Sequence, residues 1–191
     1  MDYMTKHYVP GNIVISCAGH FERAALMDTL NRHFLGGSVG AHGARKVSTL
    51  AGGRRFRAVR KDIEQVHLCL GFPGFALDED EQYPLFVLNN ALGGSMSSRL
   101  FQSIREARGL AYSVYSYPSS YTDTGYFALY AGTGEGTAEQ VTALILEELE
   151  KLRRGGLTEE EFIRSKEQLK GSYMLGQEST SARNSAIGKM E

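Results

Sequence analysis

The chain has little cysteine, no excess of charge of either sign and no long apolar run. Its 191 residues include two cysteines, too few for a disulfide framework. We expect Cys17 and Cys69 to be small buried side chains in a reducing compartment. A net charge of -1 gives no general attraction to nucleic acid or to an acidic membrane. Because no bilayer-length apolar run and no signal-peptide segment is present, we expect a cytoplasmic protein without a membrane or nucleic-acid partner.

The sequence also lacks paired zinc ligands. Neither His-x-x-Glu-His nor His-Glu-x-x-His occurs, the two spacings that place a pair of histidines and a general base on one helix. His67 and Cys69 alternate on one face of a predicted strand, but a structural zinc ion needs four ligands and no second cluster supplies the others. We therefore expect both side chains to pack in the core, and no metal site in this chain.

What is present is the composition of a folded protein, 42% hydrophobic and 23% charged. The spacing of apolar residues predicts the order β-α, linker, ββ-αα-ββ-αα. This order indicates an α+β fold, a largely antiparallel sheet with helices packed on one face. The predicted strands are 12–18, 56–61, 64–72, 110–118 and 126–133. The predicted helices are 22–34, one with Pro84 in its first turn, 97–107, and two that begin at the capping boxes Thr137-Gln140 and Thr158-Glu161.

Glycine divides the chain into two parts. Residues 36–55 contain six glycines and little apolar content, which is a linker composition. We interpret residues 1–35 as the terminal strand and helix of a preceding domain, and residues 56–191 as a second domain that is cut short. Because an open sheet edge favours pairing, we expect strand 12–18 to pair with the second sheet, within one chain or between two copies. The basic run over 45–61 suits either the attraction of an acidic partner or nucleic acid, or simple solvation, and we favour solvation.

The stretch from Gly93 to Tyr112 carries the strongest indication of chemistry. Gly93 and Gly94 lead into a short helix that stops at a glycine, and a strand begins at once. This order brings Arg105, on the last helical turn, and Tyr112, on the strand, to one junction. A guanidinium and a phenol placed together donate hydrogen bonds to a carbonyl oxygen or an oxyanion. The structural alternative is a helix-end cation beside a strand aromatic, and Arg108 is the residue we expect to bond the terminal carbonyls.

Two further patterns in this region leave alternatives open. The glycine pair at a helix N-terminus can cradle an anion, but it lacks the lysine and the spacing of a P-loop, so we favour a tight connection between two helices. Four tyrosines can stack nucleic-acid bases, but in an alternating hairpin we expect them to cover both faces of the sheet. They are Tyr112, Tyr115, Tyr117 and Tyr121.

Four segments of the sequence match one family. They are Tyr8-Val9-Pro10-Gly11-Asn12-Ile13-Val14-Ile15 with Ala18-Gly19, Glu64-Gln65-Val66-His67 with Gly71-Phe72, the stretch from Leu92-Gly93-Gly94 to Tyr112-Ser113, and Leu157-Thr158-Glu159-Glu160-Glu161-Phe162. Together they resemble the pitrilysin/insulinase-type zinc peptidases, in particular the subgroup similar to the mitochondrial processing peptidase subunits. The resemblance covers nearly the whole chain and implies the metallopeptidase LuxS/processing-peptidase-like sandwich, incomplete at the C-terminus.

The resemblance implies part of a zinc-dependent endopeptidase that cleaves unfolded peptides as a homo- or hetero-oligomer. The family's zinc motif lies in its first domain, so the zinc ligands are absent from this chain and the chain alone is expected to be inactive. The pair Arg105 and Tyr112 matches a family pair that faces the zinc across the substrate chamber and binds the substrate carbonyl and the oxyanion. Gly93 and Gly94 match a stretch that borders the peptide channel. The alternative is a non-catalytic partner subunit of a processing-peptidase-like heterodimer.

Overall fold

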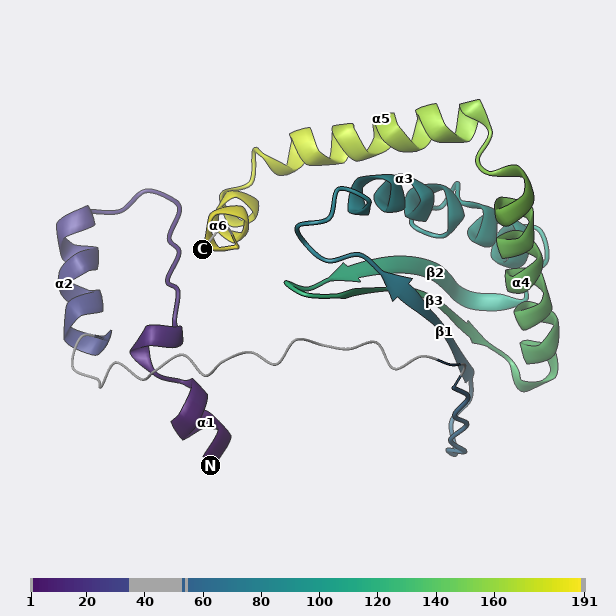
Figure 1. Ribbon diagram of the computed structural model, residues 1–191, viewed down its shortest axis with the longest axis horizontal. Coiled ribbons are helices and arrows are strands. Elements are labelled where there is room, and N and C mark those ends of the chain that lie inside the picture. Colours follow the sequence, from purple (N-terminus) through teal and green to yellow (C-terminus); the bar gives the residue numbers. More distant parts are fainter. Residues whose placement is uncertain (1, 35–52, 54, 190–191) are drawn as a thin grey trace. The chain divides into compact units, whose positions relative to one another are not determined.

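The computed structural model describes residues 2–34, 53 and 55–189 (Figure 1). The chain divides into two compact units, one formed by Met1–Lys46 with Gly171–Glu191 and the other by Val47–Lys170. The predicted glycine-rich linker falls almost entirely outside the described residues. None of the described helices is long and apolar enough to cross a membrane.

The unit formed by Val47–Lys170 is built on a three-stranded antiparallel sheet. Its strands are β1 (Val66–Gly74), β2 (Ala111–Ser120) and β3 (Gly125–Thr133), in the order β1-β3-β2. This confirms the α+β class and the predicted hairpin. The strand predicted over 56–61 is wrong, because these residues pair with no strand and Phe56 is 94% exposed. An alternating pattern among basic residues does not make a strand when no neighbour offers hydrogen bonds to its backbone.

Helices cover one face of this sheet, as predicted (Figure 1). They are α3 (Gln82–Leu92), the π-helical turn η2 (Phe101–Glu106) and α4 (Ala138–Gly155), with the short η3 (Glu135–Thr137) before α4. Alternate strand residues such as Leu129 and Ala131 point to this face and are fully buried. The core contains Leu92, Leu100, Ile104, Ala111, Val114, Phe127, Leu129, Ala131, Val141 and Ile145. A helix with Pro84 in its first turn is present as predicted.

The other face of the sheet carries side chains that we expected in the core. Cys69 and His67 are exposed, because the neighbours Leu68 and Leu70 take the positions that face the helices. Their predicted burial is therefore wrong: a period of two fixes which residues share a face but does not say which face is covered. Of the four tyrosines predicted to cover the sheet, Tyr115 and Tyr117 lie on this face, and Tyr112 lies beside Arg105 of η2. The rings that contact one another across the uncovered face are Tyr115, Tyr117, Tyr126 and Tyr130.

The unit formed by the two ends of the chain is helical. Its helices are α1 (Asp2–His7), η1 (Pro10–Asn12), α2 (Arg23–Phe34), the end of α5 (Glu159–Gly176) and α6 (Thr180–Gly188). The strand predicted over 12–18 is wrong, because residues 13–18 form no strand within the described part of the chain. The pairing proposed for this segment between two copies stays a prediction. Cys17 in this segment is exposed, which also corrects its predicted burial. The helix predicted over 22–34 forms, but none of its residues is buried.

One segment remote in sequence does meet residues 13–18. The Ser16 hydroxyl donates to Asn184 of α6, 2.8 Å from the side-chain Oδ1 and 3.0 Å from the main-chain oxygen. A side-chain hydrogen bond of this kind holds an extended segment without building a sheet edge. The contact explains how residues 13–18 are fixed within their unit without the strand pairing that alternation alone predicts.

The two predicted capping boxes have different outcomes. At α5 the box forms, because the Glu161 amide donates to the Thr158 hydroxyl at 3.2 Å and the Thr158 amide donates to Glu161 Oε2 at 2.8 Å. At α4 the predicted box is wrong. The Thr137 hydroxyl instead lies 2.7 Å from the Thr133 hydroxyl and 3.1 Å from the Gly134 carbonyl oxygen, which it contacts as a donor.

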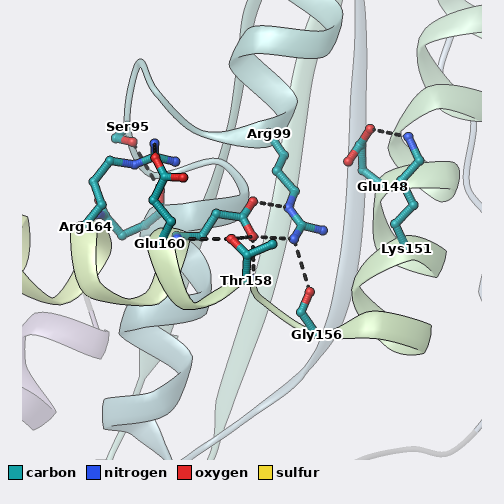
Figure 2. Close-up of polar contacts among 10 residues, drawn as sticks. Ser95, Arg99, Glu148, Lys151, Gly156, Thr158, Glu160 and Arg164 are labelled. Atoms are coloured by element: carbon teal, nitrogen blue, oxygen red, sulfur yellow. Dashed lines mark hydrogen bonds and ion pairs between the residues drawn. The ribbon is translucent and has the colours of Figure 1, made fainter.

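Arg99 joins the helix before β2 to the start of α5. Its Nε and Nη2 lie 2.6 Å from the two carboxylate oxygens of Glu161, and Nη2 also donates to the Gly156 carbonyl at 3.1 Å (Figure 2). Hydrogen bonding to Arg99 lowers the pKa of Glu161 to about 2 from its ordinary 4.5, and the bonds from Thr158 act in the same direction. Because two nitrogens of Arg99 bind the two oxygens of Glu161, the contact fixes the direction of the first turn of α5.

Acidification is expected to weaken the fold through Glu161. The folded-state pKa is about 2 and the unfolded value about 4.5, so this stabilisation is present above pH 4.5 and is lost as the pH falls toward 2. Allowing for its partial exposure, the contribution is on the order of 2 kcal/mol. Urea unfolding is measured at pH 7 and pH 3. The free energy of unfolding should fall less between these pH values for Glu161→Gln than for the original protein. Glu159→Gln, in the first turn of the same helix, is the control. An equal fall of the unfolding free energy in all three proteins would contradict the role of Glu161 in this pH dependence.

Candidate functional site

The candidate site lies where α3, η2 and β2 meet. After α3, the amides of Gly93 and Gly94 both donate to the Asn89 carbonyl, at 2.9 and 2.7 Å, which turns the chain tightly. The Gly93 carbonyl then accepts from the Ser116 amide of β2 at 3.1 Å. A Cβ on Gly93 would lie 2.5 Å from the Ser116 nitrogen, so only glycine fits this approach. The structure thus has the predicted tight connection between two helices, pressed against the edge of the sheet.

The helical segment after the glycine turn ends in a wide turn. Residues 101–106 are π-helical, with the Ala107 amide bonded to the Gln102 carbonyl at 3.0 Å. Gly109, at a φ of 63°, then reverses the chain into β2, a conformation that favours glycine. Single π-helical turns within helices occur frequently at functional sites. Here the turn carries Arg105 in its last part, beside the start of the strand.

Arg105 and Tyr112 do come together. The guanidinium carbon of Arg105 lies 5.8 Å from the centre of the Tyr112 ring and 5.0 Å from that of Phe101, so the cation lies over both aromatic rings. Tyr112 is 73% exposed. Within the described part of the chain, Arg105 makes no ion pair and no hydrogen bond. A guanidinium held in this way keeps its N–H groups available to a ligand.

An open cavity of about 630 Å³ adjoins Arg105, whereas Tyr112 is not one of its lining residues. Its lining unites three predicted site residues, Arg105, Gly93 and Gly94, with residues that sequence reasoning missed. The most informative of these is Gln168, which reaches the cavity from α5. No local motif marks it, because only the folded position of α5 brings it to this place. The remaining lining residues are Ser95, Met96, Ser97, Phe101, Ser113, Val114 and Tyr115.

The alternatives considered for nearby residues are settled by their contacts. Arg108 donates from Nη1 to the Ser103 carbonyl at 2.5 Å, so it bonds a carbonyl near the end of its helix as expected. His67 Nδ1 lies 2.6 Å from the Tyr130 hydroxyl on the uncovered face. Across the described ranges, no group of three or more His, Cys, Asp or Glu side chains is placed to hold a metal ion.

Comparison with known proteins decides the family. The family described as "Peptidase M16 inactive domain" matches residues 1–169. The chain belongs to the M16 peptidase family. This confirms the resemblance inferred from the four sequence segments. Zinc, which this family implies, finds no ligand set among the described residues of the M16 chain.

Relatives of this M16 chain are named as zinc proteases, and it matches only part of each. It is 45% identical over 193 residues to the Bacillus subtilis protein "Uncharacterized zinc protease YmxG", covering 99% of this chain and 46% of the relative. It resembles a solved M16 inactive domain from Pseudomonas fluorescens with a TM-score of 0.61 at 27% identity, over 67% of this chain and 31% of that one. A Helicobacter pylori protease shares the fold, with a TM-score of 0.73 at 23% identity, over 90% and 43% of the two chains.

Proposed function

We propose that this chain is the non-zinc part of an M16 zinc endopeptidase and forms a wall of its substrate chamber. Arg105 and Tyr112 are the groups that bind the peptide carbonyl, and Gly93 and Gly94 border the channel in which the peptide lies. One observation carries the proposal: the Arg105 guanidinium lies over two aromatic rings, without an acidic partner in the described residues, at an open cavity. A structural arginine at a helix end bonds carbonyls, as Arg108 does.

The chemistry of this pair follows from its donors. The guanidinium offers up to five N–H groups and the phenol one O–H, and none of the guanidinium donors is used within the described chain. Donors fixed in advance around a carbonyl oxygen stabilise the negative charge that this oxygen gains as the peptide bond is attacked. The contacts with Phe101 and Tyr112 restrict the side chain of Arg105, so less entropy is lost on binding.

Zinc has no place in this part of the mechanism. The ion would be held by another part of the proposed peptidase, because the described residues offer no ligand set. When bound there, zinc supplies the Lewis acid and the activated water of such a hydrolysis. This chain holds an extended substrate and presents donors to its carbonyl groups. We also propose that the peptidase works as a homo- or hetero-oligomer, in which two such halves enclose the chamber.

A second candidate function is a partner subunit that has no zinc of its own. The match to a domain described as inactive is compatible with this role as well as with the first. Such a subunit would complete the chamber of a catalytic subunit, as in a processing-peptidase-like heterodimer. The residues at the zinc-motif position elsewhere in the protein separate the two candidates: His-x-x-Glu-His makes it an enzyme, and other residues make it a partner.

The proposal is tested by assaying the part and the whole. Residues 1–191, purified and supplied with zinc, are expected to hydrolyse no internally quenched peptide, since they hold no ligand set in their described part. The full-length protein is expected to cleave it, and a chelator to abolish the cleavage. Chelator-sensitive turnover by residues 1–191 alone would contradict the proposal. Turnover by the full-length protein only after a zinc-bearing subunit is added would favour the partner role.

A further inference from the structure

Two adjacent asparagines at the end of α3 tie the glycine turn to its surroundings. Asn89 faces β2, where its Oδ1 accepts from the Ser116 hydroxyl at 2.7 Å. Asn90 faces α5 and is only 7% exposed. Its amide nitrogen donates to the Ser165 carbonyl at 3.4 Å and to Gln168 Oε1 at 3.1 Å. Since buried polar groups are kept where they are hydrogen-bonded, Asn90 fixes the end of α3 against α5.

These contacts determine which end of the Gln168 amide faces Asn90. A main-chain carbonyl can only accept, so the Asn90 atom that contacts Ser165 must be its nitrogen. That nitrogen is a donor, and Gln168 must therefore offer its oxygen to it. The remaining amide nitrogen of Gln168 has no hydrogen-bond partner in the described parts of the chain. Gln168 lines the cavity that also holds Arg105 and Gly93, and its side chain is exposed there.

We propose that Gln168 is a substrate-binding residue that donates from Nε2 to a main-chain carbonyl of the peptide in this cavity, and that Asn90 is a positioning residue that orients it. The inference rests on the proposed function. A neutral amide donor recognises the peptide backbone without selecting a charged side chain, which suits a substrate class of unfolded peptides of varied sequence. The ion pair of Arg99 with Glu161 fixes the start of α5, the helix that carries Gln168.

The test compares three variants of the full-length protein on an internally quenched peptide. Gln168→Glu keeps the side-chain size and an oxygen for Asn90 but replaces the donor by an acceptor, and Gln168→Ala removes both. Each is expected to raise KM by about tenfold with little change in kcat, as for a neutral hydrogen bond made equally in the bound and transition states. Gln140→Ala is the matched control, because Gln140 is an exposed glutamine of α4 outside the cavity, and should leave both constants unchanged.

Asn90 is tested through its dependence on Gln168. Asn90→Ala is expected to raise KM severalfold, and to raise it no further when Gln168 is already alanine, because the two act as one unit. An unchanged KM in both Gln168 variants, with activity still lost in Arg105→Ala, would overturn this inference and leave the proposed function standing. Activity unaffected by Arg105→Ala would overturn the proposed function itself. If Asn90→Ala has a lower melting temperature but an unchanged KM, the contact between Asn90 and Gln168 is structural only, which would overturn the inference.

Discussion

Replacing Arg105 with alanine is expected to lower kcat/KM of the proposed full-length peptidase by about 10²- to 10³-fold, the usual effect of removing one oxyanion donor. The loss should fall on kcat, since the donor acts most strongly on the oxygen that gains charge in the transition state. The fold should be unaffected. Arg105 is exposed and makes no ion pair in the described chain, so its removal leaves no buried group without a partner. Steady-state kinetics and thermal unfolding of the same preparation measure both effects.

Arg108→Ala is the matched control for this substitution. Arg108 is three residues away, equally exposed, and donates to the Ser103 carbonyl instead of facing the cavity. We expect its removal to leave kcat/KM within about twofold of the original and to change stability by less than about 0.5 kcal/mol, as for ordinary surface substitutions. Equal losses of activity in the two variants would show that the general positive charge of this helix end matters, and not the placement of Arg105.

Replacing Gly93 with alanine is expected to be the most damaging single change to the fold of the site. The new Cβ would lie 2.5 Å from the Ser116 nitrogen and 2.6 Å from the Ser116 hydroxyl oxygen, closer than real Cβ contacts come. Because the nitrogen belongs to the backbone of β2, the turn itself must move, and the 3.1 Å hydrogen bond from Ser116 to the Gly93 carbonyl must lengthen. We expect a loss of about 2–3 kcal/mol of unfolding free energy, as for other overpacked sites.

The corresponding fall in melting temperature is roughly 5–10 °C for a chain of this size. Gly136→Ala is the control, because nothing lies within 4 Å of a Cβ at Gly136, and it should unfold like the original protein. The turn also borders the cavity with Arg105, so Gly93→Ala should reduce peptide cleavage as well as stability. A Gly93→Ala protein as stable as the Gly136→Ala protein would contradict the close approach of the turn to β2.

Local sequence patterns predicted the features that depend on neighbours along the chain. The hairpin of β2 and β3 and the capping box of Thr158 with Glu161 are of this kind. The juxtaposition of Arg105 and Tyr112 follows from the same reasoning, since a glycine that ends a helix directly before a strand leaves only a short path between them. Seven positions separate these two residues, and no distant part of the fold is needed to bring them together.

Features that depend on distant contacts could not be predicted in this way. Alternation showed that Cys69 and His67 share a face, but which face the helices cover is decided by α3, η2 and α4. Residues 13–18 alternate like a strand, yet a strand needs a partner, and a hydrogen bond to α6 takes its place. Gln168 enters the cavity only because α5 packs beside α3, a contact between residues 78 positions apart.

The central claim is that Arg105 and Tyr112 act on one substrate oxygen, and a double-mutant cycle tests it most directly. The kcat of the full-length peptidase is measured for Arg105→Ala, Tyr112→Phe and the double variant, with Arg108→Ala as control. We expect each single change to lower kcat, and the double variant to lose clearly less than the product of the two single losses, since both donors serve the same charge. Losses that multiply independently, or a Tyr112→Phe protein with unchanged kcat, would contradict the claim.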